Sequence, residues 1–180
     1  RLYFQPLQVT LALKERNGGK LNSHLWFFTG FCNQVVPDWV LLLDVGTQPS
    51  SEAIAKLCRA MHRNPTIGGV CGEVAVRHPR AYNIIEAAQN FEYKVSHILD
   101  KAMESVFGYI SVLPGAFSAF RWDAIRRAPL SAYFFVEESN MLELGPFLAN
   151  MYLAEDRVLC FEVLAKRGQR WTLHYEAGAV

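Results

Sequence analysis

The stretch WVLLLDVGT, residues 39–47, is an apolar run that ends in a carboxylate. It follows Pro37-Asp38 and is closed by Gly46 and Pro49, a pattern typical of a strand buried on both faces in a parallel sheet. Ligands of open parallel sheets bind beyond the carboxyl ends of the strands, so Asp44 is placed to meet a metal ion or a phosphate. Position alone leaves a second interpretation open, in which Asp44 caps the next helix or starts a turn.

Strand and helix patterns alternate on both sides of this run. Alternation of this kind predicts an α/β layered domain with a mostly parallel sheet. The expected elements are a strand at 7–13, a polar turn at 14–20, a helix at 25–31, a helix from 49 to 63, a strand at 67–76, a helix at 83–107, two short strands around Pro114-Gly115 within 109–121, a helix at 122–127, a linker at 129–146, a helix at 152–168 and a strand at 171–175.

Two of these elements carry residues whose role the pattern leaves open. Gly72-Glu73 lies inside an expected strand, where a glycine allows a ligand or another backbone to come close; the alternative is a strand bulge with a surface carboxylate. The expected helix at 83–107 has an apolar side made by Ile84, Ala88, Phe91, Val95, Ile98 and Ala102. Its opposite side is polar, and spacing alone indicates a solvated face there.

Composition excludes several classes of protein. Of the 180 residues 51% are hydrophobic, which is enough for a core, and the net charge of +1 with mixed charge runs indicates no nucleic-acid role. The four cysteines form no Cys-x-x-Cys pair and are expected to be buried free thiols in a reducing compartment. No apolar window reaches the length of a membrane span. The start at Arg1 and the end at Val180 suggest a domain truncated at both ends.

Three long motifs carry a resemblance to a known family. They are QNFEYK at 89–94, ESVFGYISVLPGAFSA at 104–119 and MYLAEDR at 151–157. Together with 20–28, 41–47 and Gly72-Glu73, they resemble in order and type the chitin synthases, which are processive inverting glycosyltransferases with a GT-A fold. The resemblance implies a three-layer GT-A-like domain.

The resemblance also implies a reaction and a set of site residues. N-acetylglucosamine would pass from UDP-N-acetylglucosamine to the non-reducing end of a growing β-1,4 chitin chain. Asp156 matches the general base, with Glu155 beside it, and Asp44 matches the aspartate that holds a divalent ion, Mg or Mn. The donor is expected near Lys14, Lys20, Asn22, His24, Gly46, Glu73, Pro114, Gly115 and Ala116. The sugar or acceptor is expected near Gln89, Tyr93, Lys94, Phe117 and Ser118, although a core place for Phe117 is an equal alternative.

One conflict concerns the proposed base. Asp156 would start a helix, where the dipole lowers the pKa of a carboxylate and so weakens it as a base, whereas repulsion from Glu155 would raise that pKa.

The resemblance places residues 1–180 in the middle of a larger protein. Its nucleotide-binding start, its acceptor motif and its membrane helices would lie outside the chain, so we expect this stretch alone to be inactive. The full-length protein would be a multi-pass protein of the plasma membrane, able to form a homodimer, with this domain on the cytoplasmic side. Two alternatives stay open: a related hyaluronan or glucan synthase, and a non-catalytic scaffold of the same fold.

Overall fold

The computed structural model describes residues 8–76, 83–134 and 154–180 of the chain. Four strands form one sheet: β1 (Trp39–Leu43), β2 (Ile67–Cys71), β3 (Phe117–Arg121) and β4 (Thr172–Tyr175). The helices are α1 (Gly19–Leu25), the π-helix η1 (Trp26–Cys32), α2 (Asn33–Val35), α3 (Ala53–Arg63), α4 (Ile84–Val95), the π-helix η2 (Ser96–Lys101), α5 (Ala102–Val106), α6 (Trp122–Ile125), α7 (Ala128–Phe134) and α9 (Glu155–Ala165).

The sheet has the strand order β1-β3-β2-β4. β1, β2 and β4 run in one direction, and β3 runs against both of its neighbours. The predicted α/β class is therefore confirmed, with one reversed strand inside the sheet. Leu43, the last residue of β1, pairs with Phe117, the first residue of β3. This register brings the segment before β3 next to Asp44.

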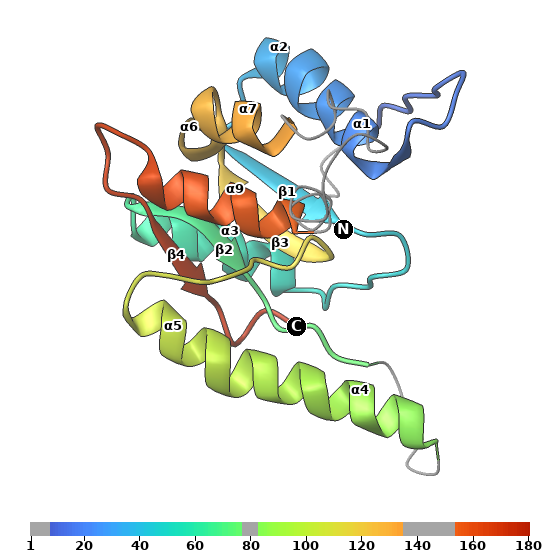
Figure 1. Ribbon diagram of the computed structural model, residues 1–180, viewed down its shortest axis with the longest axis vertical. Coiled ribbons are helices and arrows are strands. Elements are labelled where there is room, and N and C mark those ends of the chain that lie inside the picture. Colours follow the sequence, from blue (N-terminus) through green and yellow to red (C-terminus); the bar gives the residue numbers. More distant parts are fainter. Residues whose placement is uncertain (1–7, 77–82, 135–153) are drawn as a thin grey trace, which may run out of the picture.

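Helices cover both faces of the sheet, which gives three layers (Figure 1). On one face α3 packs through Ala53, Leu57 and Met61 against Val70, Phe117 and Ala119. On the other face α1, η1, α6, α7 and α9 build the larger core around Phe28, Phe120, Tyr133, Leu159 and Leu173. The three-layer arrangement agrees with a GT-A-like fold.

The position after β2, Gly72, has no room for a side chain. A Cβ at Gly72 would collide with the carbonyl oxygen of Ala179, and Glu73 N donates to the same oxygen at 2.7 Å. The sequence left open whether a ligand or another backbone comes close to this glycine, and in the structure it is the backbone of Ala179. β2 itself ends at Cys71 and is shorter than the predicted strand.

Three predicted elements are wrong in the part of the chain that the structure describes. Residues 8–13 form no strand, and Val9, Leu11 and Leu13 are 79%, 88% and 91% exposed. The segment 109–121 holds one strand, β3, because residues 109–113 make no ladder; Leu113 N donates instead to Cys160 Sγ of α9. The first part of the expected linker is the helix α7, whose buried Leu130 and Phe134 join the core; residues 135–146 lie outside the described residues.

The long helix is where the pattern predicts it, but its orientation is reversed. α4, η2 and α5 follow one another without a break from Ile84 to Val106, along one side of the molecule (Figure 1). Most of the expected apolar side faces solvent: Ile84 is 84%, Phe91 71% and Ile98 53% exposed, whereas Val95 is half-buried and Ala102 packs against the core. The buried side chains of this helix are His97 and Lys101. The predicted packing of its apolar side is therefore wrong for most of the helix and holds at Ala102.

Two further expectations concern cysteines and membrane spans. All four cysteines are free; Cys32, Cys71 and Cys160 are buried and Cys58 is half-buried, so the predicted free thiols are confirmed. Among the described residues, every helix is too short or too polar to cross a membrane.

Candidate functional site

Asp44 lies directly after β1, as the sequence predicts, and its side chain is exposed. Its N–H donates to Ala116 O at 3.2 Å, and its carbonyl accepts from Thr47 N at 3.1 Å. Gly46 completes this turn with φ of +95°, a conformation that glycine adopts without strain. The backbone of Asp44 is thus fixed at the rim of the sheet beside Ala116, and its carboxylate is open to solvent.

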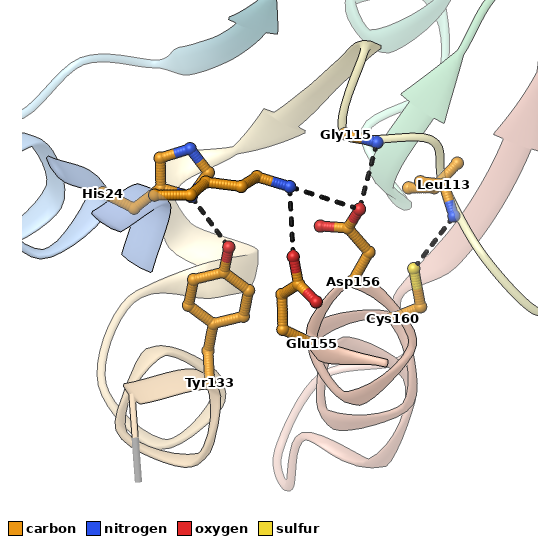
Figure 2. A network of polar contacts seen from close by, with 8 residues as sticks. His24, Leu113, Gly115, Tyr133, Glu155, Asp156 and Cys160 are labelled. Carbon is orange, nitrogen blue, oxygen red and sulfur yellow. Dashed lines mark hydrogen bonds and ion pairs between the residues drawn. The ribbon is translucent and has the colours of Figure 1, made fainter. Parts of the chain in front are cut away.

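Two carboxylates face this rim from the first turn of α9. The Oδ2 atom of Asp156 accepts a hydrogen bond from Gly115 N at 3.2 Å (Figure 2). The Lys20 ammonium lies 3.1 Å from Glu155 Oε1 and 3.8 Å from Asp156 Oδ2. Both acidic side chains are partly shielded, at 19% and 24% exposure. The fold therefore joins the start of α1, the start of α9 and the segment before β3 in one charged cluster.

Gly115 is required by this close approach. A Cβ at this position would lie 2.8 Å from Asp156 Oδ2 and 3.1 Å from Lys20 Nζ. A side chain here would push the carboxylate and the ammonium away from the backbone. The sequence predicted a role for Pro114-Gly115-Ala116 at the donor, whereas in this structure Gly115 holds the carboxylate that matches the base.

Burial sets the direction of the pKa of Asp156. Burial raises this pKa, the Lys20 cation acts against the rise, and the negative charges of Glu155 and Asp44 add to it. The net direction is upward, against the lowering expected from a helix terminus. On Lys20, burial lowers the pKa but Asp156 and Glu155 outweigh it, so the pKa of Lys20 is raised and the side chain is a cation at neutral pH.

His24 faces the protein rather than an open site. Its Nδ1 lies 2.7 Å from the hydroxyl oxygen of Tyr133, and the two rings stack at 6.1 Å (Figure 2). Burial lowers the pKa of His24, and the nearby Lys20 cation acts in the same direction. The imidazole is therefore neutral at pH 7.

The other donor residues predicted in the first turn lie together. Lys14 Nζ donates to Asn22 Oδ1 at 3.2 Å and to Gly19 O at 3.4 Å. The structure brings Lys14 and Asn22 together, apart from the acidic pair that Lys20 contacts.

A cavity of about 490 Å³ is lined by the segment that follows Asp44 and includes two of the predicted donor residues, Gly46 and Glu73. Glu73 is shielded and pairs with Lys94 of α4 at 2.6 Å. This pairing joins the segment after β2 to the long helix. The lining of the cavity comprises Gly46, Thr47, Gln48, Pro49, Ser50, Glu73, Val74, Ala75, Phe117 and Val180.

The predicted sugar-site residues do not form one group. Gln89 donates to the Tyr93 hydroxyl at 3.2 Å along α4, and Lys94 is held by Glu73. Phe117 and Ser118 are 1% and 0% exposed. Phe117 belongs to the core on the α3 side, in line with the alternative stated for it, and the Ser118 hydroxyl makes no hydrogen bond with the described residues. The prediction that Phe117 and Ser118 present their side chains to a sugar is not supported.

A divalent ion fits this donor set in one way. Among the described residues no group of three His, Cys, Asp or Glu side chains is arranged to hold a metal. Magnesium, however, commonly binds one or two carboxylates and completes its shell with water and substrate phosphates. The exposed carboxylate of Asp44 suits that mode, because substrate oxygens can approach it.

Residues 3–180 match the family model described as a chitin synthase-like glycosyltransferase domain. The chain belongs to this family. Chitin synthase 1 of Phytophthora sojae is 51% identical over 177 residues, which cover 97% of this chain and 19% of that protein. Chitin synthase C of Aspergillus oryzae is 49% identical over 94% of this chain, and chitin synthase 1 of Saccharomyces cerevisiae is 49% identical over 94%.

Membership of the chitin synthase-like glycosyltransferases confirms the resemblance and the enzyme class. The chain spans 19%, 19% and 15% of the lengths of these three relatives. It therefore represents a short part of proteins of that kind.

Two residues of this candidate site were missed from the sequence. Tyr133, which holds His24, falls where the pattern predicts a linker. Cys160 lies one turn after Asp156, and its sulfur accepts from Leu113 N at 3.2 Å, which ties the segment before Gly115 to α9 (Figure 2). Burial raises the pKa of this thiol to about 12. Its four-residue spacing from Asp156 was the available signal.

Proposed function

We propose that the full-length protein transfers N-acetylglucosamine from UDP-N-acetylglucosamine to the non-reducing end of a β-1,4 chitin chain, with inversion at the anomeric carbon. The observation that carries this proposal is Asp156, held by Gly115 N and Lys20 at the rim where β1 delivers Asp44. The family membership supports the same reaction class.

The chemistry assigns one base and one leaving group. The Asp156 carboxylate takes the proton of the acceptor hydroxyl, whose oxygen bonds to the anomeric carbon while the bond from that carbon to the diphosphate oxygen breaks. UDP leaves with the electron pair. Attack from the face opposite the leaving group turns an α-linked donor into a β-linked product. The raised pKa of Asp156 strengthens it as a base.

Glu155 and Asp44 support this step. Glu155 fixes the Lys20 ammonium beside the base. Asp44 would hold a divalent ion, magnesium or manganese, whose charge would offset that of the diphosphate. Lys14, Asn22, His24, Gly46 and Glu73 stay assigned to the donor side, and Gln89, Tyr93 and Lys94 to the acceptor or sugar side.

The location of the reaction is part of the proposal. We assign the full-length protein to the plasma membrane, through segments outside these 180 residues, with this domain on the cytoplasmic side. Protease digestion of sealed vesicles of known orientation tests this, because the domain is cut only where the cytoplasmic side faces out.

The test of the function is polymer synthesis from labelled UDP-N-acetylglucosamine by membranes carrying the full-length protein. We expect a polymer that chitinase digests, and none from Asp156→Asn although that variant still binds UDP. A product that resists chitinase would assign the protein to a hyaluronan or glucan synthase. A folded, UDP-binding protein that makes no polymer would favour a scaffold.

A further inference from the structure

Lys20 joins two helix starts that are 135 residues apart in the chain. It lies in the first turn of α1, and its ammonium reaches both acids in the first turn of α9. A lysine ammonium carries three N–H donors, and one of them is engaged by Glu155 Oε1 at 3.1 Å. The position of Lys20 next to Gly115 places that ammonium against the same backbone that binds Asp156.

The charges around Asp156 show what Lys20 does there. Glu155 from α9 and Asp44 from the end of β1 are carboxylates and favour the protonated form of Asp156. His24 of α1 is held neutral against Tyr133 of α7, and Cys160 of α9 is a thiol at neutral pH. Arg157 of α9 is exposed and the structure gives it no contact with Asp156. Gly115 contributes one N–H. Lys20 is therefore the cation that acts on this carboxylate within the described residues.

Lys14 and Lys20 differ in what holds them. Lys14 contacts the neutral Asn22 amide oxygen and a backbone carbonyl, and no acid of the described residues pairs with it. The charge of Lys20 is matched by Glu155 and Asp156 before any donor binds. A phosphate approaching Lys20 would have to compete with two carboxylates, whereas one approaching Lys14 would not.

We propose that Lys20 is a positioning residue for the base, which keeps the Asp156 carboxylate ionised and oriented through Gly115, rather than a ligand of the donor phosphates. This inference rests on the proposed function, in which Asp156 is the base. Removing the Lys20 charge leaves burial, Glu155 and Asp44 unopposed, and all three raise the pKa of Asp156. A larger fraction of the base is then protonated at a given pH.

The experiment compares pH profiles of polymer synthesis by membranes carrying the full-length protein with Lys20→Met, Lys20→Arg and Lys14→Met. For Lys20→Met we expect the acidic limb of kcat to move to higher pH, with a rate loss of roughly tenfold on that limb that shrinks as the pH rises. UDP affinity stays within about twofold of the parent, which also shows that the variant folds. Lys20→Arg keeps the charge and restores the limb.

Lys14→Met is the matched control, because it removes a lysine of the same turn that does not touch the acids. Its acidic limb should stay in place whatever happens to its UDP affinity. Weaker UDP binding by Lys20→Met with an unmoved limb would make Lys20 a phosphate ligand and overturn the inference. A uniform rate loss at every pH would overturn it as well. Polymer synthesis by Asp156→Asn would instead remove Asp156 as base, which is a failure of the proposed function.

Discussion

The helix α3 and the continuous helix α4-η2-α5 carry equally clear apolar patterns, yet they sit on the molecule in opposite ways. α3 buries Ala53, Leu57 and Met61 completely against the sheet. The long helix buries His97 and Lys101 and exposes its apolar side (Figure 1). Periodicity states which side chains share a face, but the face that meets the sheet depends on what the sheet offers.

The polar side of the long helix finds partners that an apolar side would not. Ser105 Oγ accepts a hydrogen bond from Tyr175 N at 3.0 Å and lies 3.1 Å from His174 Nδ1, and the His97 ring lies 6.1 Å from the Tyr175 ring. Lys94 pairs with Glu73 beside the cavity. The resemblance to QNFEYK pointed to function at this side, whereas spacing alone predicted a solvated face.

The largest expected effect is a loss of stability when the packing of α3 against the sheet is weakened. Leu57→Ala opens a cavity at a fully buried position and should lower the free energy of unfolding by about 2–5 kcal/mol. Denaturant unfolding of the 180-residue chain measures it. An effect below about 1 kcal/mol would mean that α3 does not pack as described.

A smaller effect concerns pH. Burial lowers the pKa of His97, so the unfolded chain takes up a proton near pH 6.5 that the folded chain resists. Stability is therefore retained above pH 6.5 and lost as the pH falls below it. His97→Gln should flatten this dependence in thermal unfolding at pH 5 to 7. His62→Gln on exposed α3 surface is the control, and equal slopes for both variants would contradict the burial of His97.

The ion pair between the long helix and β2 should contribute less. Lys94 is 47% exposed, so Lys94→Met is expected to cost about 0.2–1 kcal/mol. A double-mutant cycle with Glu73→Gln isolates the pair, and a coupling energy of zero would show that the two side chains do not interact.

The smallest effect should come from the apolar side of the long helix. Phe91 is 71% exposed, so Phe91→Ala should change the unfolding free energy by no more than about 0.5 kcal/mol. Its contrast with Leu57→Ala tests the comparison directly. A loss of several kcal/mol would mean that the helix is turned with its apolar side inward, as the pattern alone predicted.

Local pattern predicted much of the fold and little of its long-range contacts. The strand at 39–43, the end of α3 before Asn64-Pro65 and the helix that starts at Glu155 were predictable because each depends on neighbouring residues. The exposed stretch 8–13 was taken for a strand because it alternates, and α7 was missed because its pattern is short. Ser118 looked accessible beside a turn, but β3 places it between β1 and β2.

The sequence by itself determined the α/β class and the family, and it supplied Asp44, Glu155 and Asp156 as the carboxylates of the proposed site. Those features are local runs or motifs that survive whatever the distant parts of the chain do. Only the tertiary structure decided that Lys20 and Gly115 meet at Asp156 and that the long helix turns its polar side inward. Contacts of this kind join residues far apart in the sequence, so they form only when the whole chain folds. Burial in the folded chain then determines which of these side chains stay charged.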